Sequence, residues 1–337
     1  MSKVKSYLSL IKFSHTIFAM PFALIGFMLG LFSTSYHPFI GAWRNKNGVY
    51  QWDLNHSLGW AWENEVAGDS LLWKLITRGE TSALPVIARY FLLVILCMVF
   101  ARSAAMAFNR YLDRQYDARN PRTAIREIPA GVISPVNALL FTIISSLLFI
   151  ACTFFINRLC FYLSPVALAV ILGYSYTKRF TALCHLILGL GLSLAPIGAY
   201  LAVTGQFALL PMLFSVTVLF WVSGFDIIYA LQDVEFDQSQ QLYSIPARLG
   251  KAKALRVSEL LHLISAAAVL FAGYDGHFGL IYWIGAAIFI GMLFYQHTLV
   301  KPKDLRRVNL AFMTSNGVAS VLFAIFVIAD YFIIINL

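Results

Sequence analysis

The sequence predicts an all-α polytopic membrane protein, with nine transmembrane helices in a single bundle around a central cavity. Hydrophobic residues make up 60% of the 337 residues, charged residues make up only 12%, and the mean hydropathy is +0.74. A soluble domain usually carries about 25% charged residues, whereas roughly 20 apolar residues in a helix cross a bilayer. Such runs recur along the whole chain, so we expect one transmembrane domain over residues 1–337.

The helices follow from the apolar runs and from the breakers between them. The expected spans are 16–34, 84–108, 133–157, 159–176, 183–204, 208–229, 255–273, 277–299 and 308–336. Short turns divide the paired runs: FINRLCF lies between the third and fourth, VTGQF between the fifth and sixth, and AGYDGHF between the seventh and eighth. No small-residue cleavage site follows the first run, so we expect an uncleaved span rather than a signal peptide.

The connection between the first two spans, at about 35–82, is too long for an ordinary loop. It holds five of the seven tryptophans, Trp43, Trp52, Trp60, Trp62 and Trp73. Because tryptophan favours the headgroup layer of a membrane, we expect an insertion that lies as a cap on the outer face. The favoured interpretation gives this insertion no catalytic part.

Lysine and arginine are distributed unevenly between the two sides of the bundle. With the N-terminus inside, the inner segments collect Lys3, Lys5, Lys12, Arg110, Arg114, Arg119, Arg122, Arg126, Lys178, Arg179, Arg248, Lys251, Lys253, Arg256, Lys301, Lys303, Arg306 and Arg307. The outer segments hold only Arg44, Lys46, Lys74, Arg78 and Arg158. Basic residues mark the cytoplasmic side of membrane proteins, so this distribution predicts the orientation. It also accounts for the net charge of +9, so we expect membrane lipid as a partner and no nucleic acid.

The four cysteines, Cys97, Cys152, Cys160 and Cys184, lie in or beside apolar runs and form no CxxC pair. Neither a disulfide framework nor a zinc site is indicated.

Two acidic segments close spans on the inner side. Asn109, Asp113 and Asp117 are spaced i, i+4, i+8, which places them within about 80° of one helix face. Asp233 and Asp237 repeat the i, i+4 spacing, and Asp226 lies seven residues before Asp233 on the same stripe. One such pair is usually a solvated helix end. Two pairs on the same side of the membrane favour a shared site instead.

Carboxylates that face each other repel unless a cation lies between them. Mg²⁺ prefers a few carboxylates, retained water and phosphate oxygens, so the pattern predicts a magnesium site held by Asp113, Asp117, Asp233 and Asp237 with Asn109 assisting. Basic residues on the same side would neutralise a bound diphosphate; these are Arg122, Arg126, Lys178 and Lys251. Set between apolar helices, this site suits a molecule with a diphosphate head and a hydrocarbon tail.

Other polar residues in or beside the spans carry weaker signals. Arg102 lies within the second span, where an ionisable residue usually faces a cavity or a partner. It is expected either to hold an acceptor's carboxylate or to pair with Asp226, and the sequence leaves both readings open. His15 is expected at the interface, with a role near the acceptor as the minority reading. His185, His262 and His297 look peripheral, and Asp330 receives no role.

At these residues the chain resembles the UbiA superfamily of intramembrane prenyltransferases, nine-helix enzymes that join polyprenyl diphosphates to aromatic or other acceptors. Two signatures carry the resemblance: N-x3-D-x3-D at Asn109, Asp113 and Asp117, and D-x2-Y-x3-D-x3-D at Asp226, Tyr229, Asp233 and Asp237. RTAIREIPAG and the Arg102 position support it. In YSYTKRFT, Tyr174 and Lys178 look like the family's diphosphate-side pair. The resemblance covers nearly the whole chain apart from 35–82.

The resemblance implies a Mg²⁺-dependent polyprenyltransferase in a bacterial cytoplasmic membrane, with its active site toward the cytoplasm. The four aspartates would act in catalysis, and Arg102, Asp226, Tyr229 and His15 would lie near an aromatic acceptor. IKFSHTIFAMPFALIG looks like the branch implicated in menaquinone synthesis by the futalosine route. Members that use 4-hydroxybenzoate usually show Asp-Lys-Pro near Ser14-His15-Thr16, which this chain lacks.

Four alternatives stand beside this reading. A transporter with an Asp-lined pathway would carry its charges near the bilayer midplane, often on broken helices, whereas most charges here lie at inner helix ends. A CDP-alcohol phosphotransferase also has a D-x3-D, but its preceding Asp-Gly and Ala-Arg pattern is absent before Asp113. Haem farnesylation is disfavoured because its characteristic second acidic segment is missing. Prenyl transfer to a non-quinone acceptor stays open.

Overall fold

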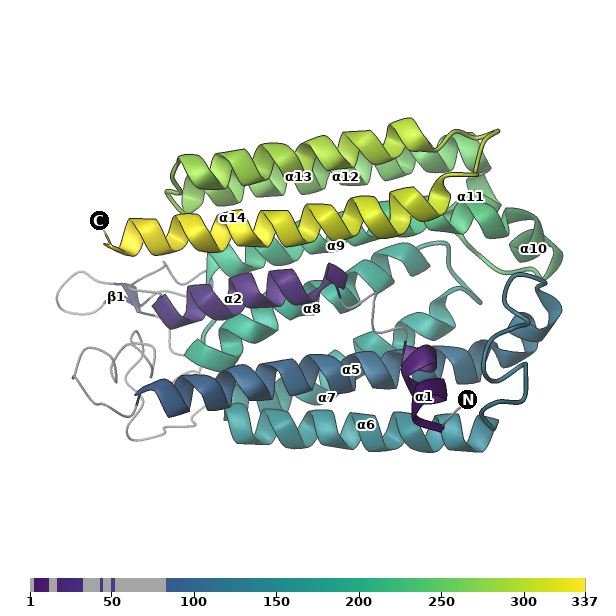
Figure 1. The fold of residues 1–337 in the computed structure, drawn as a ribbon, viewed down its shortest axis with the longest axis horizontal. Helices are drawn as coiled ribbons and strands as arrows, with labels where there is room; N and C mark the ends of the chain where they lie inside the picture. The colour runs from purple at the N-terminus through teal and green to yellow at the C-terminus, as the bar shows by residue number, and fades with distance from the viewer. Residues whose placement is uncertain (1–2, 12–16, 33–42, 45–49, 52–82, 337) are drawn as a thin grey trace.

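The chain forms an elongated bundle of long helices that run roughly side by side (Figure 1). A computed structural model describes residues 3–11, 17–32, 43–44, 50–51 and 83–336. Within these residues, eight helices are long and apolar enough to cross a membrane, and Met20–Leu31 forms a shorter apolar helix. This arrangement confirms the all-α membrane fold, and the eight long helices plus the short one agree with the nine expected spans.

The helices have the following bounds: α1 Lys3–Ile11, α2 Met20–Phe32, α5 Ala83–Arg119, α6 Pro135–Ile156, α7 Arg158–Thr177, α8 Cys184–Thr204, α9 Leu209–Ala230, α10 Val234–Ser239, α11 Ile245–Leu249, α12 Lys251–Asp275, α13 Leu280–Leu299 and α14 Asn316–Asn336. A 3₁₀ turn, Leu231–Asp233, joins α9 to α10, and a π-helical turn, Leu310–Ser315, precedes α14.

Helix α5 is much longer than the expected span 84–108. It has 37 residues and ends at Arg119. At 1.5 Å per residue it is about 55 Å long, whereas the hydrocarbon core of a bilayer is about 30 Å thick. The polar stretch after Phe108 therefore continues the helix beyond the apolar part, and Asn109, Asp113 and Asp117 share one rigid element.

The expected division between the third and fourth spans is confirmed at Asn157. This residue has an extended backbone that ends α6, and its side chain accepts a hydrogen bond from Cys160 N at 2.8 Å, which caps α7. Its amide also donates to the backbone oxygen of Leu201 at 2.8 Å. One side chain thus ends one helix, begins the next and ties the turn to α8.

The second acidic segment is less regular than its spacing predicts. Asp226 lies on α9, Asp233 closes the 3₁₀ turn and Asp237 lies on α10. The continuous helical stripe expected from Asp226 to Asp237 is therefore interrupted at Leu231–Asp233.

A cluster of aromatic side chains forms the core between α2, α9, α13 and α14. Trp221 is fully buried there, contacts Phe22 and Phe289, and donates its indole N–H to Asn316 Oδ1 at 2.8 Å. Helices α8 and α9 approach each other closely at Gly189, where an added Cβ would lie 2.3 Å from the Leu219 carbonyl oxygen. This approach sets the distance between the two helices that carry His185 and Asp226.

Most of the 35–82 insertion lies outside the described residues. Strands β1 (Trp43–Arg44) and β2 (Tyr50–Gln51) form a short antiparallel pair, with Trp43 opposite Gln51. The pair lies at the end of the bundle opposite to α10 and α11 (Figure 1). Trp52, Trp60, Trp62 and Trp73 fall outside the described residues, so the outer cap stays a prediction.

Asp330, to which the sequence assigned no role, ties α14 to the start of α13. Its buried carboxylate accepts hydrogen bonds from the backbone N–H groups of Gly279 at 2.7 Å and Tyr282 at 3.1 Å. The first N–H groups of a helix lack partners within the helix, and an anion there is favoured by the helix dipole.

We expect Asp330→Ala to lower the free energy of unfolding by about 1–3 kcal/mol, because two buried N–H groups lose their acceptor. Thermal unfolding in detergent measures the effect, with Asp304→Ala on the exposed loop between α13 and α14 as the control. An equal melting temperature for wild type and Asp330→Ala would contradict this role.

Candidate active site

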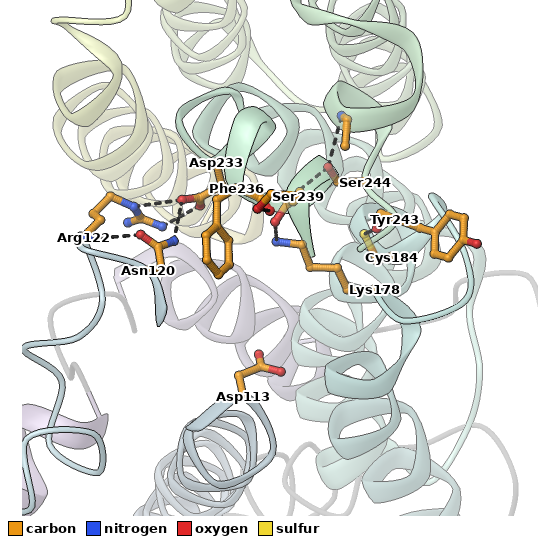
Figure 2. Close-up of polar contacts among 12 residues, drawn as sticks. Asp113, Asn120, Arg122, Lys178, Cys184, Asp233, Phe236, Ser239, Tyr243 and Ser244 are labelled. Atoms are coloured by element: carbon orange, nitrogen blue, oxygen red, sulfur yellow. Dashed lines mark hydrogen bonds and ion pairs between the residues drawn. The ribbon is translucent and has the colours of Figure 1, made fainter. Parts of the chain in front are cut away.

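Both acidic segments line one cavity at the end of the bundle that carries α10 and α11. The cavity has a volume of about 280 Å³, and its lining includes Asn109, Asp113, Asp117, Asp233 and Asp237. Figure 2 shows Asp113 on α5 pointing across the site toward the group around Asp233. The structure therefore brings together the five residues that the sequence pattern proposed as metal ligands.

Each of the four aspartates pairs with a basic side chain. The distances are 3.4 Å for Arg179–Asp113, 2.6 Å for Arg126–Asp117, 2.5 Å for Arg122–Asp233 and 2.7 Å for Lys178–Asp237. Arg179 is the one partner in this set that the sequence analysis placed only among the topology signals; its position directly after Lys178 was the available clue. Repulsion among the carboxylates is thus balanced by cations from two segments, the loop after α5 and the turn after α7.

Arg122 joins the loop after α5 to the second acidic segment. Its Nε and Nη2 donate to the two oxygens of Asp233 at 3.0 and 2.5 Å, and its Nη1 donates to the Tyr229 hydroxyl at 2.9 Å. Asn120 donates to the same carboxylate at 3.3 Å (Figure 2). Burial lowers the pKa of Arg122, but the Asp233 carboxylate and the Tyr229 hydroxyl outweigh it, so the pKa is raised. The guanidinium stays charged, as a ligand for an anion must.

Lys178 likewise forms an ion pair with Asp237, whose side chain is 0% exposed. The other carboxylate oxygen of Asp237 accepts a hydrogen bond from Ser244 Oγ at 2.9 Å. Burial lowers the pKa of Lys178, but the charge and hydrogen bond of Asp237 outweigh it and raise the pKa above its usual value. The stabilising ion pair is therefore present below the usual pKa of lysine and is lost only as the pH rises through the raised value.

The side chains at this cavity fit a hard divalent cation. Oδ2 of Asp117 is buried without a hydrogen bond in the described structure, and Arg110 Nη1 lies 4.0 Å from it. Carboxylate and amide oxygens are the donors that Mg²⁺ prefers. Among the described residues no three His, Cys, Asp or Glu side chains form a ready-made cluster. Metal binding therefore requires these carboxylates to exchange their Arg and Lys partners for the ion.

Aromatic rings cover another part of the same cavity. Tyr229 and Phe312 lie with their ring centroids 4.3 Å apart, and Phe225 and Phe18 continue this wall. Phe312 belongs to the π-helical turn Leu310–Ser315, a geometry that is often found at functional sites.

The expectation that His185 is peripheral is wrong. His185 is buried on α8, lines the cavity, and places its Nδ1 2.7 Å from Asp226 Oδ2. Gly189, one turn further along α8, lies close against α9, the helix that carries Asp226. Of the two readings of Arg102, pairing with Asp226 is not observed. The Arg102 Nε is buried without a hydrogen bond among the described residues.

A second, apolar cavity of about 380 Å³ adjoins the first. It lies between α5, α6, α7 and α8, with wall residues such as Cys97, Phe149, Val170 and Gly198. Four residues line both cavities, namely Arg102, Tyr174, Leu188 and Leu192. The cavity with the acidic segments and the apolar cavity therefore share a wall, and Arg102 and Tyr174 lie at this junction.

Four predicted or considered residues are not among the described residues at the cavity. Lys251 binds Glu235 at 2.7 Å and is not among the residues that line the cavity, so its proposed diphosphate contact is corrected. His15 lies outside the described residues. His262 and His297 contact each other at 2.8 Å away from both cavities, in agreement with their expected peripheral place.

Lys178 and Lys251 form a matched pair for a test of this arrangement. We expect Lys178→Met to lower kcat/KM for an anionic substrate by about 10- to 150-fold, because a charge-assisted contact contributes about 1.5–3 kcal/mol. Lys251→Met removes the same charge from an exposed ion pair and should have little effect. Steady-state kinetics of both variants measures this difference, and equal losses would contradict it.

The chain has clear relatives among known proteins. Residues 75–318 match the UbiA prenyltransferase family. A 4-hydroxybenzoate octaprenyltransferase of Nitrosospira multiformis is 32% identical over 242 residues, which cover 72% of this chain and 83% of that relative. A protein of the same description from Tolumonas auensis is 29% identical, over 75% of this chain and 89% of the relative.

Two solved structures share the fold. A UbiA homolog from Aeropyrum pernix K1 superposes with a TM-score of 0.68 at 25% identity, over 95% of this chain and 98% of that one. A UbiA homolog from Archaeoglobus fulgidus, bound to DMAPP and Mg²⁺, gives a TM-score of 0.66 at 18% identity, over 96% and 98% of the two chains. The expected family is thereby confirmed: this chain belongs to the UbiA prenyltransferase family.

Proposed function

We propose that this multi-pass membrane enzyme transfers a polyprenyl group from a polyprenyl diphosphate to an aromatic quinone precursor in a Mg²⁺-dependent reaction. The acceptor is of the hydroxybenzoate or dihydroxynaphthoate type, and the product serves menaquinone or ubiquinone synthesis. One observation carries the proposal: the cavity with both acidic segments shares a wall with an apolar cavity. A diphosphate and its hydrocarbon tail need these two environments side by side.

The diphosphate head belongs among the four ion pairs. Asp113, Asp117, Asp233 and Asp237, with Asn109, would hold Mg²⁺, which when bound supplies Lewis-acid stabilisation of the departing pyrophosphate. Arg122, Arg126, Lys178 and Arg179 are already within ion-pair distance of these carboxylates. They become free to donate to phosphate oxygens when the carboxylates take another partner. Tyr174, at the junction of the two cavities, lies where the reacting end of the tail would sit.

The apolar cavity gives the tail and the reacting carbon a dry environment. Its walls belong to helices that exclude water, which would otherwise capture an allylic cation. An electron-rich ring carbon of the acceptor then forms the new bond, and no covalent protein nucleophile is needed. The aromatic wall of Phe18, Phe225, Tyr229 and Phe312, together with Asp226, offers a flat surface for the acceptor ring.

Both the relatives and the charge distribution support the cellular setting. The Nitrosospira and Tolumonas relatives are bacterial 4-hydroxybenzoate octaprenyltransferases, and the Archaeoglobus homolog binds DMAPP and Mg²⁺. The cavity that holds the acidic segments is also lined by basic residues, among them Arg110, Arg122, Arg126, Lys178 and Arg179. We place the protein in the bacterial cytoplasmic membrane with its active site toward the cytoplasm. Within the family, IKFSHTIFAMPFALIG favours the menaquinone branch.

The test is a reconstituted transfer reaction. Purified protein is incubated with Mg²⁺, a labelled prenyl diphosphate and a panel of acceptors that includes 4-hydroxybenzoate and both kinds of dihydroxynaphthoate. We expect one acceptor to become labelled, EDTA to stop the reaction and added Mg²⁺ to restore it. Transport of a solute without any prenyl transfer would favour the Asp-lined transporter instead, and transfer only to a non-aromatic acceptor would change the substrate class.

A further inference from the structure

We propose that His185 is a positioning residue for the acceptor, which holds Asp226 so that this carboxylate takes the acceptor's hydroxyl proton. The inference rests on the proposed function. It concerns a residue in neither acidic signature, and one whose sequence context gave no sign of a role.

The hydrogen bonds of His185 determine which ring nitrogen carries the proton. The backbone N–H of Ile245 donates to Nε2 at 3.4 Å, and a backbone N–H has no acceptor capacity. Nε2 therefore accepts, and in the neutral ring the proton lies on Nδ1. Nδ1 is 2.7 Å from Asp226 Oδ2, so this contact is an Nδ1–H donation to the carboxylate. The histidine ring therefore holds the Asp226 carboxylate in a fixed orientation, as the hydrogen-bond partner of a catalytic side chain commonly does.

The two side chains of this pair differ in how far they are buried. The side chain of His185 is 3% exposed, whereas that of Asp226 is 23% exposed and faces the cavity. The histidine thus stands behind the carboxylate, and Asp226 Oδ1 makes no hydrogen bond within the described part of the chain. A free carboxylate oxygen facing a cavity is an acceptor without a donor, which a ligand hydroxyl satisfies.

The neighbours of Asp226 indicate what kind of molecule bears that hydroxyl. Tyr229 lies one turn along the same face of α9, and its ring packs on Phe312 with a centroid distance of 4.3 Å. Asp233, which binds Arg122 in the diphosphate region, lies one further turn along. An aromatic ring beside Tyr229 and Phe312 therefore has its hydroxyl near Asp226 and its carbons toward the diphosphate end.

The step balances as follows. The bond between the prenyl carbon and the diphosphate oxygen breaks, and the ring carbon next to the hydroxyl-bearing carbon forms a bond to that prenyl carbon. The hydroxyl proton passes to Asp226 Oδ1, which leaves a neutral dienone. Loss of the ring C–H proton restores aromaticity while the oxygen regains a proton from Asp226. The net products are the prenylated phenol, diphosphate and one proton.

The short helix α11 connects this pair to the diphosphate region. Ser244 Oγ binds Asp237 at 2.9 Å, and the next residue, Ile245, donates its N–H to His185. Ser244 thus holds the Asp237 carboxylate at the diphosphate side. The next residue, Ile245, holds the Asp226 carboxylate at the acceptor side through His185.

Four variants test the inference: His185→Leu, which removes both hydrogen bonds; His185→Asn, whose amide can replace Nδ1–H; Asp226→Asn; and the control His297→Leu, in a half-buried histidine outside both cavities. Kinetics uses the acceptor that the wild type prenylates and a ring-fluorinated analogue whose hydroxyl is more acidic. We expect His185→Leu to lower kcat/KM for the acceptor by about 10- to 100-fold. The KM for the prenyl diphosphate and the control should change by less than about twofold.

Three further results are expected if the proton passes to Asp226. His185→Asn recovers most of the lost activity, the fluorinated acceptor loses less than its parent, and His185→Leu adds little to Asp226→Asn. Equal losses with both acceptors, or an equal rise in the KM for the prenyl diphosphate, would show that His185 only supports the fold and would overturn the inference while leaving the proposed function intact. An inactive wild type would overturn both.

Discussion

Replacing Asp113 or Asp233 with asparagine is expected to lower prenyl transfer by at least about 10³-fold, because under the proposed function each change removes a charge that would hold the metal and, through it, the diphosphate. The two residues belong to different acidic segments that line one cavity. If the two segments bind one ligand together, both variants should therefore lose activity. Transfer of a labelled prenyl group at saturating Mg²⁺ measures the effect.

Folding of these variants needs its own control, since each aspartate also pairs with an arginine. Asp113→Asn removes the carboxylate that pairs with Arg179, and Asp233→Asn removes the one that pairs with Arg122. Both arginines are partly exposed to the cavity. We expect membrane insertion and detergent-solubilised yield to stay close to wild type. Asp304→Asn, at an exposed pair with Arg306, should retain full activity. Retained activity in both Asp113→Asn and Asp233→Asn would refute the metal roles.

Gly198→Trp is expected to shift the enzyme from long to short prenyl diphosphates. Gly198 lines the apolar cavity, and an added Cβ there meets no other described atom within 4 Å. A tryptophan side chain would therefore fill the cavity rather than push helices apart. Displacing one five-carbon unit of the tail removes roughly 4 kcal/mol of apolar burial, since each buried CH₂ contributes about 0.8 kcal/mol.

The expected result is a loss of about 10²- to 10³-fold in kcat/KM for octaprenyl diphosphate, with dimethylallyl diphosphate nearly unaffected. Gly173→Trp provides the matched control, because Gly173 on α7 also has open space around its Cα but lines neither cavity. A chain-length profile that is the same for Gly198→Trp and wild type would show that the tail lies elsewhere.

The number and order of the spans could be predicted because each depends on a local run of apolar residues. The turn at Asn157 and the end of α8 at Thr204 agree with breakers that are visible in the sequence. The i, i+4, i+8 spacing placed Asn109, Asp113 and Asp117 on one helix face, but the expected span ended at residue 108 and α5 continues to Arg119, because hydropathy marks where a helix leaves lipid and not where it ends. The 3₁₀ turn at Leu231–Asp233 has no local signal that we can identify.

The acidic residues of the site were also predictable, since i, i+4 spacing on two inner helix ends is a local pattern. The positions of Arg122 and Lys178 agreed with expectation, but Lys251 did not, although all three are basic residues in inner segments. Charge and topology place such residues on the correct side of the membrane. They do not determine which of them reach a cavity and which bind a neighbour such as Glu235.

The sequence by itself thus determined the membrane class and the two acidic segments, because these follow from composition and from local spacings, and the resemblance of its two signatures indicated the family. Only the tertiary structure decided that His185 supports Asp226, across 41 residues, and that Arg122 binds Asp233, across 111. Contacts of this kind depend on how closely two helices approach, as at Gly189, where the lack of a side chain brings α8 against α9. That distance is set by packing of the whole bundle, and no local pattern encodes it.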